Sequence, residues 1–90
     1  MCRNIRPLHH FEPPASSEEV HAAALQYVRK IGGTASPSRA NQPAYDLAVA
    51  TIAQATQQLL DSMVARGAPK DRQVEADKAR ARSAARFARR

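Results

Sequence analysis

Two stretches of the sequence repeat apolar residues at helical spacing, and a loop rich in Gly, Ser, Thr and Pro separates them. The first predicts a helix over about 17–31, with one apolar stripe made of Val20, Ala24, Tyr27 (or Val28) and Ile31. The second predicts a longer helix over about 42–66, with a stripe made of Tyr45, Val49, Ile52, Ala53, Thr56, Leu59, Leu60 and Met63. Two such helices joined by a loop form an αα-hairpin, so the sequence predicts an all-α fold.

Local signals mark the ends of both expected helices. Ser16 followed by Glu19 is a capping box, in which the hydroxyl and the carboxylate each accept a hydrogen bond from a backbone N–H. Asn41 is the expected cap of the second helix, and Pro43 suits its first turn because proline has no N–H to leave unpaired. The stop signals are Gly32-Gly33 for the first helix and Gly67 with Pro69 for the second.

Alanine dominates the apolar residues, so the hairpin has material for only a thin core. Of the 90 residues 19 are alanine, whereas Leu, Ile, Val and Phe together number 15. In so short a chain the free energy gained by burial roughly cancels the cost of ordering, which makes self-association an expectation. The expected core consists of Ile5, Leu8, Phe11, Val20, Tyr27, Val28, Ile31, Tyr45, Val49, Ile52, Leu59 and Met63.

The first fifteen residues are expected to be extended, because three prolines between positions 7 and 14 disfavour a helix. Ile5, Leu8 and Phe11 recur at every third position, and a polyproline-like segment with three residues per turn would place them on one side. We interpret this segment as an extended strap laid across the hairpin. A short recognition peptide for a partner is the alternative.

Positive charge gathers at the C-terminal end. Residues 70–90 carry eight Lys or Arg against three Asp or Glu, whereas residues 1–69 are nearly neutral. We therefore divide the chain into a helical domain, 1–67, and a basic, partly helical tail, 68–90. Five cations of the tail fall in one helical arc: Lys78, Arg82, Arg86, Arg89 and Arg90.

This basic arc would neutralise phosphates and release their counterions, which predicts weak, sequence-tolerant binding of nucleic acid. The alternative is a solvated tail that keeps a small protein in solution. No residues of the body form a pattern typical of base readout. A membrane-surface role is disfavoured, because the other side of this helix is mostly alanine and lacks bulky anchors.

Cys2 is the only cysteine, which excludes a disulfide framework and a multi-cysteine zinc site. If Met1 is removed, the α-amine of Cys2 would act as a base beside its own thiol, and Arg3 and Arg6 would favour the thiolate. An inert thiol is the alternative, because the sequence places no further catalytic group beside it.

His9 and His10 would join Cys2 as metal ligands only if their side chains converged. Neighbouring residues of an extended chain point to opposite sides, and the usual ligand spacings are missing. We therefore expect no metal site. Phosphate-binding loops, dinucleotide motifs, membrane-spanning runs and a signal peptide are not expected either, and no cofactor is implied.

Four segments of residues 1–66 resemble a family of small bacterial proteins catalogued as a domain of unknown function. Its members open with Met-Cys-Arg-Asn-Ile and carry a Phe-x-Pro-Pro motif. The resembling segments are Met1–Ile5, Phe11–Ala15, Ala23–Lys30 and Pro37–Asn41. The resemblance implies a small helical fold without an assigned activity, and the tail after Gly67 is expected to lie outside it.

These patterns favour a non-enzymatic, cytoplasmic interaction module that forms a homo-oligomer through the hairpin stripe. Nucleic-acid binding through the basic tail and thiol or metal chemistry at Cys2 are the alternatives.

Overall fold

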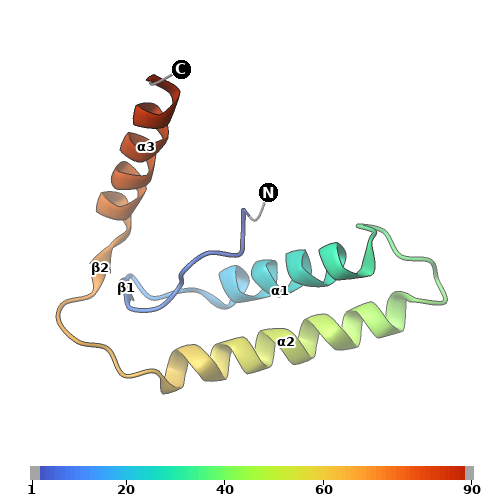
Figure 1. The fold of residues 1–90 in the computed structure, drawn as a ribbon. Helices are drawn as coiled ribbons and strands as arrows, with labels where there is room; N and C mark the ends of the chain where they lie inside the picture. Colours follow the sequence, from blue (N-terminus) through green and yellow to red (C-terminus); the bar gives the residue numbers. More distant parts are fainter. Residues whose placement is uncertain (1–2, 89–90) are drawn as a thin grey trace.

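A computed structural model describes residues 3–88, with the side chains described as far as residue 86. Helix α1 (Ser17–Gly32) and helix α2 (Gln42–Ser62) run side by side as a hairpin, and helix α3 (Arg72–Ala88) leaves the open end of the hairpin (Figure 1). Two short strands, β1 (Phe11–Glu12) and β2 (Lys70–Asp71), complete the elements of the described chain. The expected all-α hairpin with an N-terminal arm and a helical tail is confirmed.

The start and end of α1 follow the local signals of the sequence. The Ser16 hydroxyl accepts a hydrogen bond from the backbone N–H of Glu19, and the Glu19 carboxylate accepts one from the backbone N–H of Ser16. At the other end Gly33 adopts a left-handed conformation with φ 83°, and its N–H donates to the carbonyl of Arg29. The capping box and the glycine stop are both confirmed.

The ends of α2 differ from the prediction. Asn41 occupies the cap position, but its side chain makes no capping hydrogen bond. The carbonyl of Ser38 instead accepts hydrogen bonds from the N–H groups of Asn41 and Gln42, so a preceding turn satisfies part of the helix start. The helix ends at Ser62 rather than near 66, because Met63 is already extended with ψ 134°.

The buried core is small and lies between α1 and α2. Ala24, Val28 and Val49 form its buried cluster, and Val20 of α1 is buried outside this cluster. Leu25, Tyr45, Ala48, Ile52 and Ala53 pack against it while remaining partly exposed. The hairpin therefore closes over one narrow strip of each helix.

Five residues of the expected core are exposed instead: Ile5, Tyr27, Ile31, Leu59 and Met63, with exposed fractions of 41%, 47%, 72%, 57% and 44%. The prediction was wrong for these residues because it required every apolar position of both stripes to be covered. The smallest extent of the molecule is 15 Å, which is little more than one helix with its side chains. A single layer cannot cover a stripe that is wider than the contact between the two helices.

The two short strands join segments from opposite ends of the chain. β1 and β2 pair in parallel, with Phe11 opposite Lys70 and Glu12 opposite Asp71. The N–H of Lys70 also donates to the carbonyl of His10 at 2.8 Å. The sequence did not predict these strands, because two residues are too few to show an alternating pattern.

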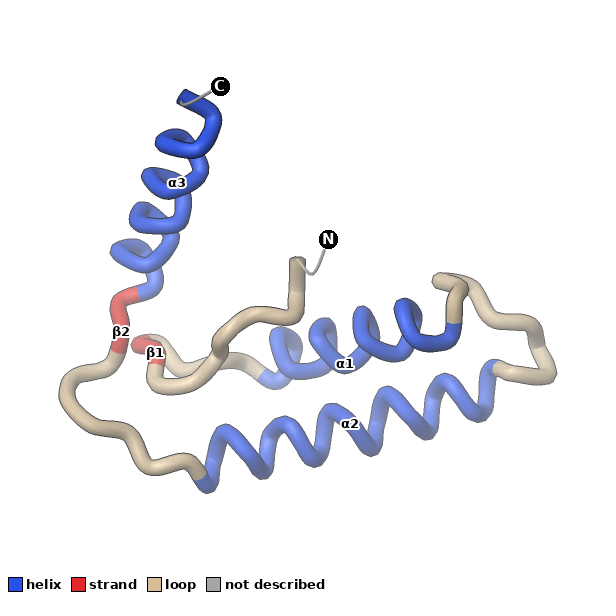
Figure 2. Tube along the Cα trace, viewed as in Figure 1, coloured by secondary structure: helices blue, strands red, loops and turns tan. Residues whose placement is uncertain are grey.

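The chain is open in shape. Its radius of gyration is 16.2 Å, whereas a compact chain of this length has a value of about 12 Å. α3 projects from the strand pair (Figure 2). Within the described residues it packs mainly against β2, and it contacts the hairpin helices far less than these two helices contact each other. None of the helices in the described part of the chain is long and apolar enough to cross a membrane.

Replacing Val49 by Ala should lower the free energy of unfolding by about 2 kcal/mol, because two buried methyl groups are lost from a core that has few buried side chains. Val64→Ala is the matched control, since this side chain is 92% exposed and should change stability by less than about 0.5 kcal/mol. Urea denaturation followed by circular dichroism measures both values. Equal losses in the two variants would contradict the assigned core.

Candidate functional site

The carboxylate of Glu19 connects three parts of the chain. Arg72, the first residue of α3, binds it with two parallel hydrogen bonds, from Nη1 to Oε2 at 3.0 Å and from Nη2 to Oε1 at 2.9 Å. Arg6 of the N-terminal arm donates from Nη2 to Oε2 at 3.2 Å. Because Glu19 also caps α1, one side chain holds the arm, the first helix and the start of α3 together. We call this group, Glu19, Arg6 and Arg72, the Glu19 cluster.

Further contacts fix Arg72 against the arm. Its Nε donates to the carbonyl of Pro13 at 2.8 Å. Its guanidinium carbon lies 5.5 Å from the centre of the Phe11 ring, and the ammonium of Lys70 lies 5.4 Å from the same ring. Cations within about 6 Å of an aromatic face are attracted to it. The first turn of α3 is therefore anchored, whereas the rest of the helix extends away.

Arg72 and the capping interaction with Ser16 lower the pKa of Glu19 from 4.5 to about 2. The hydrogen bonds from Arg72 contribute most, those from Ser16 follow, and desolvation opposes them. The carboxylate is therefore charged at neutral and mildly acidic pH, and the cluster is a structural ion pair. These partners leave it poorly suited to act as a general base near neutral pH.

An apolar groove of about 380 Å³ runs between the N-terminal arm and the hairpin. Five residues were predicted to be buried but are exposed, and four of them line this groove: Ile5, Tyr27, Leu59 and Met63. The fifth, Ile31, lies outside it. The remaining lining is Arg6, Pro7, Leu8, His9, Ala23, Ala24, Ile52, Thr56 and Leu60. The strap thus lies along the hairpin but leaves an open channel beside it, rather than closing the core.

The predicted basic arc of the tail is only partly available to a partner. Lys78 pairs with Glu75 at 3.2 Å, which offsets part of its charge. Arg82 and Arg86 lie on one surface of α3 beside Ala79 and Ala85, and neither forms an ion pair within the described residues. The last two predicted members, Arg89 and Arg90, lie outside the described residues.

The side chains of His9 and His10 lie close together, whereas the sequence predicted that they would point to opposite sides. Their ring centres lie 5.7 Å apart, because His10 has φ 61° and so interrupts the alternation of an extended chain. Nε2 of His10 forms a hydrogen bond with the carbonyl oxygen of Gly67 at 3.0 Å, which gives this ring a structural role. In the part of the chain that the structure describes, no three His, Cys, Asp or Glu residues gather as metal ligands. Cys2 lies outside the described residues, so its thiol or metal chemistry stays a prediction.

Sequence reasoning missed the Glu19 cluster. The capping box accounted for Glu19 completely, and no pattern links Glu19 to Arg72, which is 53 residues further along the chain. The one available signal was weak: Arg72 stands near the start of the helical tail pattern, three residues after Pro69, which ends the pattern of the second helix.

Comparison with known proteins adds the family. The family model described as "Uncharacterized conserved protein (DUF2277)" matches residues 1–78, which is most of the chain. The chain belongs to this family. No curated protein and no solved structure matches the DUF2277 chain. The predicted resemblance is confirmed, but the end placed at Gly67 was wrong, since the match continues through β2 and Arg72 to Lys78.

The Glu19 cluster makes stability depend on pH. Because the folded pKa of Glu19 is below its ordinary value, its contribution is fully present above about pH 4.5 and is lost as the pH falls toward 2. After allowance for solvent screening at a site near the surface, the loss should be ~1–2 kcal/mol. Urea denaturation of wild type and Glu19→Gln between pH 6 and 2.5 measures it.

In this experiment Glu19→Gln should be less stable than wild type at pH 6 and should approach it at low pH. Glu18→Gln is the control, because Glu18 is an exposed neighbour in the same turn and makes no ion pair within the described residues. A Glu18→Gln profile that flattens as much as that of Glu19→Gln would sink the assignment.

Proposed function

We propose that this protein is a non-enzymatic helical interaction module that self-associates through the apolar groove. The observation that supports it most directly is the gathering of Ile5, Tyr27, Leu59 and Met63 around one channel, each more than 40% exposed. Contiguous exposed apolar surface is typical of protein interaction sites. The proposal places the module in the cytoplasm, an expectation that comes from the sequence alone.

The amount of exposed surface also favours an assembly. A compact monomer of this mass exposes about 5,200 Å², whereas this chain exposes 7121 Å². Part of the excess belongs to α3, which projects from the hairpin (Figure 1). The excess nevertheless exceeds the ~800 Å² that each partner buries in an interface of standard size.

A second copy of the chain is the occupant that best fits the groove. In a two-fold dimer the same patch meets itself, so an apolar patch finds an apolar partner without a further specificity device. Tyr27 and Leu59 stand at opposite walls of the groove, on α1 and α2, and provide bulky side chains for insertion into the partner's groove. Arg6 at the edge is already paired with Glu19, so association need not bury an unpaired charge.

Light scattering of the wild type should give twice the chain mass of 9.8 kDa at micromolar concentrations. Leu59→Glu should weaken this association at least about tenfold, since it places a charge at the centre of the patch. Leu47→Glu is the matched control on the same helix, because Leu47 is 69% exposed and does not line the groove.

Circular dichroism establishes that both variants fold, and Tyr27→Ala offers a second test from the opposite wall. A monomeric wild type, or equal loss of association in the two Leu→Glu variants, would overturn the proposal. A different protein that binds the groove while the chain stays monomeric would do so as well.

Weak binding of nucleic acid through α3 is the second candidate. It is supported by the projection of α3 from the body and by the exposed guanidinium groups of Arg82 and Arg86, which form no ion pair with any side chain that the structure describes. Two guanidinium groups one helical turn apart suit successive phosphates rather than base edges. Binding of this kind would be sequence-tolerant and sensitive to salt.

The double variant Arg82→Gln/Arg86→Gln should bind a labelled random duplex more weakly than wild type at low salt. The slope of log affinity against log salt should fall by about 2, because two phosphate contacts are lost. Arg39→Gln/Arg66→Gln removes the same charge outside α3 and should keep the slope. Fluorescence anisotropy measures both, and equal slopes in the two double variants would exclude α3 as the binding element.

A further inference from the structure

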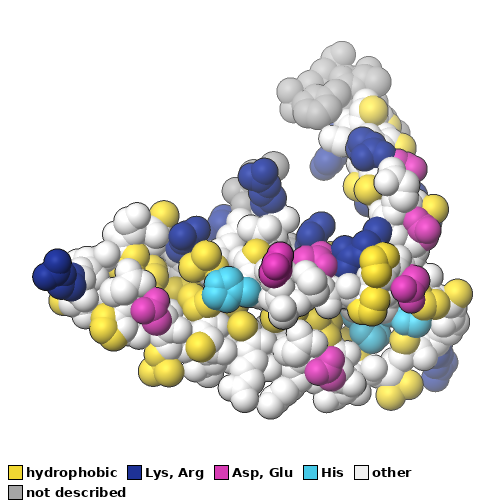
Figure 3. Space-filling view, turned by 180° about the vertical axis from the view of Figure 1, so that it is seen from behind, with side chains coloured by type: hydrophobic (Ala, Val, Ile, Leu, Met, Phe, Trp, Pro, Cys, Tyr) yellow, Lys and Arg dark blue, Asp and Glu magenta, His cyan; other side chains and the backbone are white. Residues whose placement is uncertain are grey.

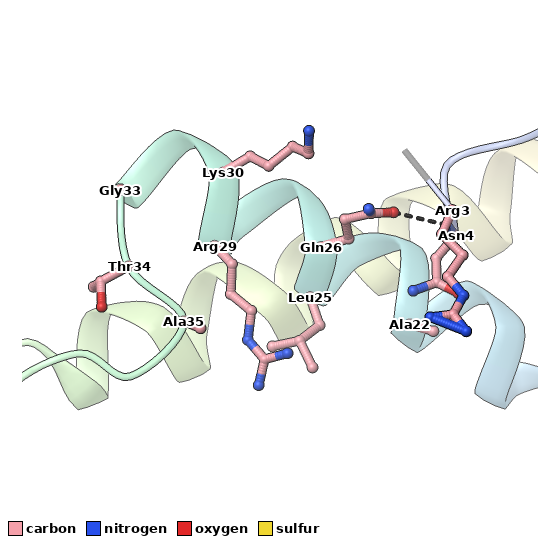
Figure 4. A pocket seen from close by; sticks show the side chains of 10 residues that line it. All are labelled: Arg3, Asn4, Ala22, Leu25, Gln26, Arg29, Lys30, Gly33, Thr34 and Ala35. Carbon is pink, nitrogen blue, oxygen red and sulfur yellow. Dashed lines mark hydrogen bonds between the residues drawn. The ribbon is translucent and has the colours of Figure 1, made fainter. Parts of the chain in front are cut away.

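A second hollow lies on a different face of α1, and it shares no lining residue with the apolar groove. It has a volume of about 630 Å³, within the range of small-molecule sites. Its walls come from three segments: the N-terminal arm at Arg3 and Asn4, the flank of α1, and the loop that follows α1 at Gly33–Ala35 (Figure 4).

Two hydrogen bonds hold the walls of this hollow in place. The backbone N–H of Asn4 donates to Oε1 of Gln26 at 2.7 Å, which fixes the arm against α1. The Tyr45 hydroxyl donates to the carbonyl of Thr34 at 3.2 Å, which ties the loop to α2. A site built from held segments loses less entropy on binding than one that must first be ordered.

The charge around the hollow has one sign. Arg3, Arg29 and Lys30 line it, and no Asp or Glu does. Within the described residues these three cations form no ion pair, in contrast to Arg6 and Arg72, which share Glu19. The basic groups seen from behind the molecule are likewise spread over its edges and not confined to the tail (Figure 3). Such a concave basic surface attracts anions.

Two of the cations bracket an apolar floor. Ala22, Leu25 and Arg29 lie on one face of α1 because their spacing is three and four residues. Figure 4 shows the Leu25 side chain between those of Arg29 and Arg3, with Lys30 on the other side of the helix. The axial distance from Ala22, beside the arm, to Arg29 is about 10 Å. The hollow thus offers two positive ends and a nonpolar middle.

We propose that this hollow binds a small organic dianion with two negatively charged groups held apart by an apolar centre. A guanidinium donates two parallel hydrogen bonds to a carboxylate or phosphate group, so Arg3 and Arg29 would each take one end. The apolar centre would lie on Leu25 and Ala22. The C-terminal end of α1 carries roughly half a negative charge, which the whole charges of Arg29 and Lys30 outweigh.

The first experiment tests the ligand chemistry on the full chain by calorimetric titration. Benzene-1,4-dicarboxylate is the probe, and benzoate and inorganic phosphate are its comparisons. The dicarboxylate should bind at least about tenfold more tightly than either, since only it has two anionic ends and an apolar centre. Equal binding of the dicarboxylate and phosphate would overturn the proposal, and so would binding of neither.

The second experiment assigns the site. Arg29→Gln and Arg3→Gln should each weaken the dicarboxylate at least about tenfold, because each removes one charge-assisted pair. Arg39→Gln is the matched control, since Arg39 is exposed in the loop before α2 and does not line the hollow. Equal weakening by Arg39→Gln would show that net charge alone attracts the probe and would contradict a defined site.

A third measurement separates this inference from the proposed self-association. Leu59→Glu alters the apolar groove and should leave dicarboxylate affinity within about twofold of the wild type, because the two sites share no residue. Thermal unfolding of Arg3→Gln and Arg29→Gln should match that of Arg39→Gln. If Arg3→Gln and Arg29→Gln weaken binding only to the extent that they lower the unfolding temperature, the proposed site is wrong.

Discussion

The whole architecture follows from the shortage of large apolar side chains in a single-layer hairpin. With Ala24, Val28 and Val49 as its buried cluster, the contact between α1 and α2 is a narrow strip. Among residues 3–88 no second layer covers the outer flanks of the two helices, so exposed apolar residues such as Ile31 and Leu59 remain there. The groove and the hollow both arise from this shortage, because the thin arm that crosses the hairpin covers too little of it to fill either.

Polar contacts and the strand pair hold the N-terminal arm in place, since the arm has little apolar packing. The arm is held at Asn4 by Gln26, at Arg6 by Glu19, and at Phe11 by the strand pair and the cations above its ring. Buried or half-buried ion pairs add little net stability compared with apolar packing, but they define one geometry strongly. The Glu19 cluster thus specifies where the arm and α3 lie rather than supplying most of the stability.

Local features of this fold could be predicted from the sequence, whereas its long-range features could not. The capping box at Ser16, the stop at Gly33 and the hairpin itself depend on neighbouring residues and on helical spacing. The end of α2 was missed because Met63 continues the apolar pattern after the backbone has become extended. Arg82 and Arg86 were proposed as binding residues from the charge pattern alone, whereas the groove and the Arg3–Arg29 hollow depend on where the arm crosses the helices, which no spacing encodes.

α3 is attached to the rest of the molecule through its first turn and projects from there. Seventeen helical residues rise by about 25 Å from the anchoring Arg72. The far end of α3 therefore lies well away from the hairpin (Figure 1). The DUF2277 chain therefore places the groove and the hollow on the hairpin and its arm, and presents the exposed cations of α3 on a separate projecting helix.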